Sequence, residues 1–248
     1  MMNFDKDKAA IVRHGKLKPV CDDELQITNL SNLISLNTQK QALLDNTIRF
    51  LQNKPANHAL LWGEMGCGKS SLVRAVFCEY MHENLRLVEI SKFELENLYD
   101  ILEILRDKKH YKFIVFCDDF SFEMGDKAVS ELKRLLEGSI QKPPNNVLFY
   151  ATSNRKHFIK AQKNDENFLI ERENSRDNLS LADRFGLIIS FYEFEFSEYL
   201  SVIDELFGEV KDKEKLHNEA RAFADSKGVR SPRSAIHFFN IYKDKFAK

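Results

Sequence analysis

Short apolar runs alternate with helical patterns through the middle of the chain. Five runs of four to six mostly apolar residues have the length of buried strands. They are Ala59–Trp62, Leu85–Ile90, Phe113–Cys117, Val147–Ala151 and Leu187–Phe191. Segments with apolar residues three or four positions apart separate the first four runs, and these segments are Ser70–Met81, Leu95–Leu105 and Ala128–Leu136. Strands that alternate with helices predict an α/β fold, with a five-stranded parallel sheet covered by helices on both faces.

The two ends of the chain have different patterns. Residues 1–28 show no clear period, and charges of opposite sign cancel over the first 24 of them, so we interpret this region as a flexible lead-in or a short docking segment. After Phe196 the pattern is helical throughout, over Ser197–Phe207, Lys213–Ser226 and Pro232–Phe246. Three helices without a strand predict a small helical subdomain over residues 195–248.

Residues 29–194 form the predicted α/β core between these ends. Leu43, Thr47 and Leu51 recur at helical spacing and predict a helix before the first strand of the core. Residues 155–180 interrupt the core, because they hold six basic and five acidic side chains and few apolar ones. We interpret them as an exposed insertion, since loops of this length are usually functional or disordered.

Composition narrows the class of protein. The chain has 248 residues, with 37 Lys and Arg against 38 Asp and Glu, and a formal net charge of −1. This balance excludes a generally basic nucleic-acid coat protein and an acidic disordered chain, but it allows a local basic channel. The sequence holds neither an apolar stretch of about 18 residues nor an apolar leader. We therefore expect no membrane span and a cytoplasmic location.

The clearest motif is Gly63–Ser70, which has the glycine spacing of a P-loop and ends in Gly-Lys-Ser. A strand is predicted before it and an amphipathic helix after it, which argues against a chance match in a glycine-rich turn. The glycines let the backbone curl so that several N–H groups point at phosphate oxygens. Lys69 supplies a charge for the β- and γ-phosphates, and Ser70 supplies a hydroxyl for Mg²⁺. The predicted nucleotide-binding residues here are Gly63, Glu64, Met65, Gly66, Cys67, Gly68, Lys69, Ser70 and Ser71.

Two carboxylates, Asp118 and Asp119, follow the third apolar run. Carboxylates at the mouth of a buried strand are costly unless they have a partner. With a P-loop upstream, Asp118 is placed to hold Mg²⁺, and Asp119 is the candidate that orients and polarises the attacking water. The alternative is a pair of N-cap residues for a helix at Ser121–Glu123, since Asp is a favoured cap.

The order of several motifs resembles that of the AAA+ ATPases from about Asn29 to the end of the chain. The P-loop and the aspartate pair are followed by Ala151-Thr152-Ser153-Asn154, Asp183-Arg184-Phe185 and Ser231-Pro232-Arg233. Three segments are similar to the bacterial domain-of-unknown-function 815 family, and they are Phe116–Glu123, Tyr150–Asn154 and Leu181–Leu187. Similarity to the 815 family implies no mechanism of its own, so the expectations below come from the AAA+ resemblance.

The AAA+ resemblance implies roles for further residues. Asn154 would be sensor 1, which hydrogen-bonds the γ-phosphate or the attacking water. Arg184 would be an arginine finger that reaches a neighbouring subunit's nucleotide. Arg233 would be sensor 2, which couples a helical lid over residues 195–248 to the γ-phosphate. The turn at Ile34–Asn37 and the helix after it would border the adenine, and the sheet order would be 5-1-4-3-2, numbered along the five predicted strands.

Some of these residues also have a plainer interpretation. Cys67 is a small residue that fits the loop, with a redox-sensitive thiol as the alternative. Arg184 alone would be an ordinary surface arginine. Arg233 is either an exposed first-turn residue or a phosphate ligand, and its charge is unfavourable near a helix N-terminus unless an anion is present.

One position departs from the AAA+ pattern. Typical members carry Asp-Glu where this chain has Asp118-Asp119, and an aspartate is one methylene shorter than a glutamate. The water would therefore be held less well, unless Glu123 reaches it from the next turn. Hydrolysis would then be slow.

These residues predict an AAA+ protein that binds and hydrolyses ATP with Mg²⁺. Nucleotide state would be coupled to a macromolecular partner, protein or nucleic acid, and the resemblance implies a homo-oligomer, a ring of six. The alternative is an ATP-gated binding switch, a loader or adaptor, with very slow hydrolysis. A small-molecule kinase would leave the polar triplet after the fourth strand and the three-helix tail without a role. The lack of an Asn-Lys-x-Asp signature after the fourth strand disfavours a GTPase.

Overall fold

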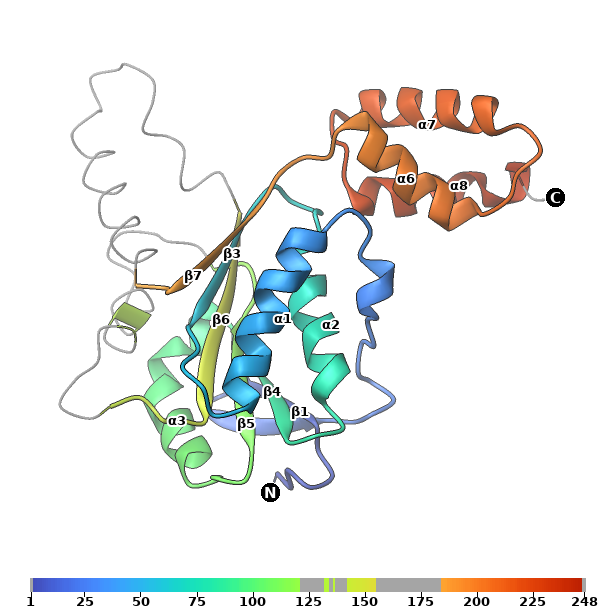
Figure 1. The fold of residues 1–248 in the computed structure, drawn as a ribbon. Helices are drawn as coiled ribbons and strands as arrows, with labels where there is room; N and C mark the ends of the chain where they lie inside the picture. Colours follow the sequence, from blue (N-terminus) through green and yellow to red (C-terminus); the bar gives the residue numbers. More distant parts are fainter. Residues whose placement is uncertain (1, 121–131, 134–135, 137–141, 155–183, 247–248) are drawn as a thin grey trace, which may run out of the picture.

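The computed structural model describes residues 2–120, 132–133, 136, 142–154 and 184–246. Figure 1 shows an α/β body and a separate group of three helices at the carboxyl end of the chain. The strands of the body are β1 (Ala9–Arg13), β2 (Lys16–Val20), β3 (Ala59–Gly63), β4 (Leu85–Glu89), β5 (Lys112–Cys117), β6 (Val147–Asn154) and β7 (Leu187–Phe191).

In the described residues these strands form one seven-stranded sheet in the order β2-β1-β4-β5-β6-β3-β7. The pairing of β1 with β2 is antiparallel, and the other neighbouring pairs are parallel. The five strands predicted from the sequence are β3 to β7, and their order is the one that the AAA+ resemblance implies. The predicted α/β fold class is therefore confirmed.

The predicted number of five strands is too low, because residues 1–28 contribute two more. β1 lies between β2 and β4 and pairs with β4 in parallel, with Ala9 opposite Leu87. β2 is the edge strand and carries Lys16, Lys18 and Pro19. Lysine and proline are typical of edge strands, where they discourage pairing with other chains, and here they obscure the apolar alternation in the sequence. The hairpin corrects the interpretation of this region as a flexible lead-in.

A carboxylate holds the turn of this hairpin. His14 and Gly15 both have a positive φ, of 52° and 66°, as a two-residue hairpin turn of the primed type requires. Glu94, in the 3-10 helix η2 (Lys92–Asn97), accepts hydrogen bonds from their backbone N–H groups at 2.7 and 2.9 Å. The bonds from Gly15 and His14 lower the pKa of Glu94 below its ordinary value. The hairpin is thus tied to the segment that follows β4.

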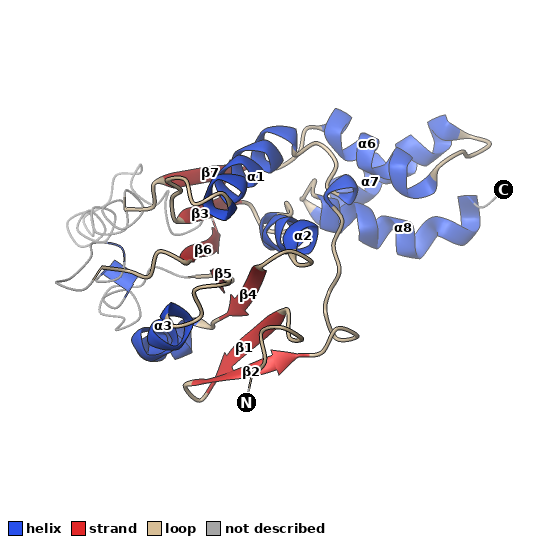
Figure 2. Ribbon diagram, turned by 60° about the horizontal axis from the view of Figure 1, so that its bottom comes forward, coloured by secondary structure: helices blue, strands red, loops and turns tan. Residues whose placement is uncertain are grey.

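Helices cover both faces of the sheet. Figures 1 and 2 show α1 and α2 on one face and α3 on the other. The bounds are α1 (Asn37–Leu51), α2 (Lys69–Tyr80) and α3 (Leu98–Arg106), with a 3-10 turn, η1 (Leu30–Asn32), before α1. The side chains of β5 alternate to match: Ile114 and Phe116 belong to the core with α1 and α2, whereas Phe113 and Val115 belong to the core with α3. A sheet with two buried faces explains why the strands read as continuous apolar runs.

The three carboxyl-terminal helices, called the lid below, are α6 (Phe196–Phe207), α7 (Lys213–Lys227) and α8 (Pro232–Phe246). Their bounds agree with the predicted helices to within one residue. Aromatic rings hold them together, since the Phe238 ring of α8 lies 5.7 Å from Phe207 of α6 and 5.5 Å from Phe223 of α7 between centroids. Ser231 and Ser234 exchange backbone-to-hydroxyl hydrogen bonds of 3.0 and 3.2 Å, which starts α8 in the manner of a capping box.

His58, just before β3, binds β6 through its imidazole and β7 through its backbone carbonyl. Its Nδ1 accepts a hydrogen bond from the backbone N–H of Phe149 at 2.9 Å, so this nitrogen carries no proton. Its carbonyl oxygen accepts the N–H of Leu187 at 3.1 Å. Burial lowers the pKa of His58 from 6.5 to about 4. Protonation would therefore break the bond to β6 and place a charge where burial disfavours it.

We expect the fold to lose stability as the pH falls through this window. Because the pKa of the folded chain is depressed, the contribution of neutral His58 is complete above about pH 6.5 and is lost as the pH falls toward about 4. Between about pH 7 and about pH 5, the free energy of unfolding should fall by roughly 1–2 kcal/mol more in the wild type than in His58→Gln. Urea unfolding at both pH values measures this difference, and equal losses in the two proteins would contradict it.

Candidate functional site

The P-loop joins β3 to α2 and lies against the end of β7. Gly63, the last residue of β3, has a φ of 136°, and a Cβ added there would lie 1.8 Å from the carbonyl oxygen of Phe191. That oxygen accepts the N–H of Glu64 at 2.9 Å. Only glycine allows the two backbones to come so close. Gly68, with a φ of 92°, then turns the chain into α2.

Lys69 begins α2, and its side chain turns back along the loop. Its Nζ donates to the carbonyl oxygens of Gly63 and Glu64 at 2.9 and 2.7 Å, and to Oδ1 of Asn154 at 3.1 Å. The residue is only 7% exposed, and this burial lowers the pKa of Lys69 below its ordinary value. These three acceptors are neutral oxygens. An anionic oxygen would be a stronger partner for the ammonium group than any of them.

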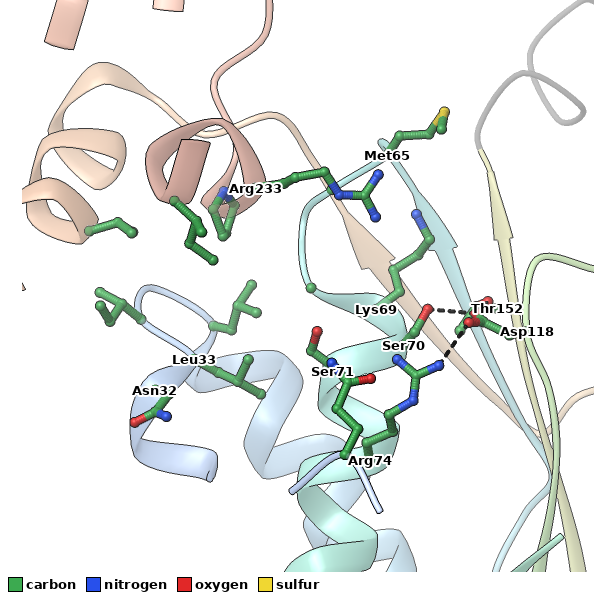
Figure 3. Close-up of a pocket in the computed structure, with 18 of the residues that line it drawn as sticks. Asn32, Leu33, Met65, Lys69, Ser70, Ser71, Arg74, Asp118, Thr152 and Arg233 are labelled. Atoms are coloured by element: carbon green, nitrogen blue, oxygen red, sulfur yellow. Dashed lines mark hydrogen bonds and ion pairs between the residues drawn. The ribbon is translucent and has the colours of Figure 1, made fainter. Parts of the chain in front are cut away.

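Asp118 lies where β5, β6 and α2 meet (Figure 3). Its Oδ1 accepts hydrogen bonds from Ser70 Oγ at 2.5 Å and from Thr152 Oγ1 at 2.6 Å. Its Oδ2 faces Nη2 of Arg74 at 3.3 Å. The carboxylate is thus held by two hydroxyls and one guanidinium.

Asp119 has an unusual backbone conformation, with a φ of 52°. Its N–H donates to Thr152 Oγ1 at 2.8 Å, and its Oδ1 accepts Nδ2 of Asn154 at 2.5 Å. The alternative role of the aspartates, as caps of a helix at residues 121–123, lies outside the described residues. Within the described part of the chain, the Asp118 carboxylate bonds to side chains of α2 and β6, and the Asp119 carboxylate bonds to Asn154 of β6.

A cleft of about 510 Å³ opens between the P-loop, the segment before α1 and the lid. The P-loop side is formed by Met65, Gly66, Gly68, Lys69, Ser70 and Ser71. The sheet side is formed by Asp118, Asp119, Thr152 and Asn154. Apolar side chains face them, among them Ile34, Leu36, Val202 and Ile236. One wall is therefore polar and charged and another is apolar, as a ligand with an anionic part and a flat apolar part requires.

The lid reaches this cleft through the first turn of α8. The N–H of Arg233 donates to the carbonyl oxygen of Gly66 at 3.4 Å, and a Cβ added at Gly66 would lie 3.1 Å from that of Arg233. In Figure 3 the guanidinium of Arg233 and the ammonium of Lys69 extend from different elements into the same space. Two cations and the amino end of α2 thus face one cavity, which suits an anionic ligand.

The remaining predicted residues lie in other surroundings. Arg184 precedes β7, and because Leu187 is opposite Ala59 while Phe191 is opposite Gly63, it lies at the end of the sheet away from the P-loop. Glu123 and the insertion at 155–180 lie outside the described residues. Cys67 is buried, and burial raises the pKa of its thiol to about 11. A protonated buried thiol supports the plainer interpretation of this cysteine.

Among the lining residues of the cleft that were not predicted as site residues, Arg74 and Thr152 are the two that contact Asp118. Arg74 lies one helical turn after Ser70, and this four-residue spacing could have pointed to it. Thr152 directly follows the predicted strand Val147–Ala151, and the observed strand extends to Asn154. A hydroxyl at the carboxyl end of a buried strand was the signal available for it.

Comparison with known proteins places the chain in a family. Residues 5–246 match the family described as Protein of unknown function (DUF815). The chain belongs to this family. The similarity noted from three segments of the sequence is thereby confirmed, and no curated protein matches this member of the DUF815 family.

Solved structures of RuvB from Thermotoga maritima are similar to this DUF815 chain at low identity. One variant is 15% identical, with 88% of this chain and 72% of that one covered and a TM-score of 0.49. A second variant is 17% identical, with 88% and 73% covered and a TM-score of 0.48. A third structure, described as a Holliday junction branch migration motor, is 15% identical, with 88% and 72% covered and a TM-score of 0.44. Within the described ranges of the DUF815 chain, no helix is long and apolar enough to span a bilayer.

Gly63→Ala should be far more harmful than alanine at another glycine with a positive φ. Gly228, with a φ of 63° and nothing within 4 Å of an added Cβ, is the matched control. We expect Gly228→Ala to cost about 1 kcal/mol of unfolding free energy, from backbone strain alone. Gly63→Ala should cost several times as much, on the order of 3 kcal/mol or more, because a backbone carbonyl occupies the space. Denaturant unfolding compares the two variants, and equal costs would contradict the close packing of the P-loop on β7.

Proposed function

We propose that the chain binds Mg·ATP in this cleft, hydrolyses it, and couples nucleotide state to the binding or remodelling of a macromolecular partner. The observation that supports this most is the convergence of Lys69, Ser70 and Asp118 at the carboxyl end of the sheet, with Arg233 facing them from the lid. A P-loop sequence alone is only a motif. Here its lysine, its serine and a carboxylate from another strand share one cavity, as phosphate binding requires.

The side chains of the cleft are of the kinds that bind phosphate and Mg²⁺. Ser70 Oγ and Asp118 Oδ1 lie 2.5 Å apart, and both are hard oxygen donors of the kind that Mg²⁺ prefers. When bound there, Mg²⁺ would neutralise charge on the β- and γ-phosphates. Lys69 would exchange its neutral acceptors for phosphate oxygens. The N–H groups of the loop and the positive end of α2 would bind the remaining phosphate oxygens, with Ile34 and Leu36 on the adenine side.

Asp119 is the residue that we assign to the attacking water. Its hydrogen bond with Asn154 places an amide beside the carboxylate, so that both can face the water and the γ-phosphate. Glu123 is the alternative for this role. The short aspartate, already engaged by Asn154, favours slow turnover, and for this reason an ATP-gated switch, a loader or adaptor, is the second candidate function.

The lid would respond to the nucleotide through Arg233. The contact between the Arg233 N–H and Gly66 already joins α8 to the P-loop. A γ-phosphate between Lys69 and Arg233 would attract α8 toward the loop, and its loss would release that attraction. The surface that the lid offers to a macromolecular partner would then depend on nucleotide state.

We further propose that Arg184 acts on the nucleotide of a neighbouring copy. It lies outside its own cleft, at the opposite end of β7. A cation supplied by a neighbour stabilises the charge that develops on the γ-phosphate in related phosphoryl-transfer sites. This role requires a homo-oligomer, for which the resemblance implies a ring of six.

Replacing Lys69 should abolish tight nucleotide binding. In Lys69→Ala we expect the affinity for a fluorescent ATP analogue to fall by about tenfold to a thousandfold, at about 1.4 kcal/mol per tenfold. Lys112→Ala is the matched control, because Lys112 begins β5 at the opposite end of the sheet from the P-loop. Unchanged affinity in Lys69→Ala, or an equal loss in Lys112→Ala, would contradict the assignment of the phosphate site.

The two candidates for the water-orienting carboxylate can be separated by amide substitution. Asp119→Asn should bind Mg·ATP normally but hydrolyse it at least about a hundredfold more slowly, since an amide is a poor base. Glu123→Gln should keep most of the activity. Steady-state phosphate release, with nucleotide affinity measured alongside, checks both variants. Normal hydrolysis by Asp119→Asn together with loss in Glu123→Gln would transfer the role to Glu123.

A further inference from the structure

A single hydroxyl lies between the two aspartates. Thr152 is 1% exposed, on β6. Its Oγ1 accepts the backbone N–H of Asp119 at 2.8 Å and lies 2.6 Å from Oδ1 of Asp118. A backbone N–H can only donate, and a threonine hydroxyl has one hydrogen. The hydroxyl proton is therefore available for Asp118, and the direction of both bonds is fixed.

The backbone around this hydroxyl leaves it little freedom. Thr152 is paired with Leu61 of β3 in the middle of the sheet. Its carbonyl oxygen accepts the N–H of Phe120 at 2.7 Å. The side chain of Thr152 thus binds the backbone of Asp119, and its main chain binds the backbone of Phe120. A left-handed conformation at a residue other than glycine costs roughly 1–2 kcal/mol, and these bonds oppose that cost at Asp119.

The hydroxyl also fixes the plane of the Asp118 carboxylate. Oδ1 accepts from Thr152 on one side and from Ser70 on the other, while Oδ2 faces Arg74. Removing the Thr152 hydroxyl would leave Oδ1 with Ser70 alone. The carboxylate could then rotate toward Arg74, and the backbone turn at Asp119 would lose its acceptor.

We propose that Thr152 is a positioning residue, which uses one hydroxyl to orient both the carboxylate that we assign to Mg²⁺ and the carboxylate that we assign to water. This inference rests on the function proposed above and adds a residue to that site. Thr152 acts through Asp118 and Asp119. Groups that orient metal ligands in this way typically change metal affinity or activity by about tenfold to a hundredfold when they are removed.

The test compares Thr152→Val, which keeps the shape but loses the hydroxyl, with Thr152→Ser, which keeps the hydroxyl. Ser153→Ala is the matched control, because the Ser153 hydroxyl is buried on the same strand and, among the described residues, makes no hydrogen bond. Each protein is first titrated with Mg²⁺ at a fixed concentration of a fluorescent ATP analogue, which gives the Mg²⁺ needed for half-maximal binding. It is then titrated with the analogue in EDTA, which gives the affinity without Mg²⁺. Phosphate release gives kcat and KM, and thermal unfolding checks the fold.

We expect Thr152→Val to need several times more Mg²⁺ for half-maximal binding, with affinity in EDTA unchanged and kcat lowered at least about tenfold. Thr152→Ser should lie within about threefold of the wild type in both measurements, since it retains both hydrogen bonds. Ser153→Ala should match the wild type. If Thr152→Val does not fold, Thr152→Cys carries the same expectations, because a thiol is a weak hydrogen-bonding group.

A Thr152→Val protein with wild-type Mg²⁺ dependence and kcat would overturn this inference and leave the proposed function intact. Failure of Thr152→Ser to restore activity would also overturn it, because shape rather than the hydroxyl would then matter. If the wild-type protein binds no nucleotide at all, the proposed function itself fails, and the role of Thr152 fails with it.

Discussion

The carboxylate of Asp118 is the contact on which the arrangement of the cleft depends. It directly follows β5, accepts hydrogen bonds from Ser70 of α2 and Thr152 of β6, and pairs with Arg74. These partners are distant in sequence, and the sheet order brings them together, because β6 lies between β5 and β3. Because β4 lies beyond β6 and β5 from β3, α2, which joins β3 to β4, passes the end of β5. Parallel strands place all these carboxyl ends at one edge, where α/β sheets bind ligands.

A second constraint is the burial of Lys69 among neutral oxygens. Removing an ammonium group from water costs free energy, which carbonyl and amide oxygens offset only in part, and the lowered pKa of Lys69 reflects this. An anionic ligand would offset more of it. Arg233 is exposed, so its cost has a different cause: its positive charge lies near the amino end of α8, where it is unfavourable without an anion. The fold thus places two cations where phosphate would relieve the cost of both.

Much of this arrangement follows from sequence patterns, and the rest depends on tertiary contacts. The apolar runs predicted β3 to β7, because a sheet buried on both faces leaves continuous apolar segments. The P-loop motif and the aspartates after the third run predicted that Lys69 and Asp118 would share a site, and the AAA+ resemblance added Asn154. The hairpin of β1 and β2 was missed, because an exposed edge strand rich in lysine has no such run. Thr152 was missed as a site residue because its role depends on the turn at Asp119, which only the three-dimensional structure shows.

The central claim is that Lys69, Ser70 and Asp118 form one site for the phosphates and metal of Mg·ATP. A crystal structure of the protein with Mg²⁺ and a non-hydrolysable ATP analogue tests it most directly. The account predicts a phosphate oxygen within hydrogen-bonding distance of Lys69 Nζ, which would no longer donate to Gly63 and Glu64, and Mg²⁺ beside Ser70 and Asp118. A nucleotide bound elsewhere, or a cleft that stays empty at saturating analogue while Lys69 keeps its carbonyl partners, would contradict it.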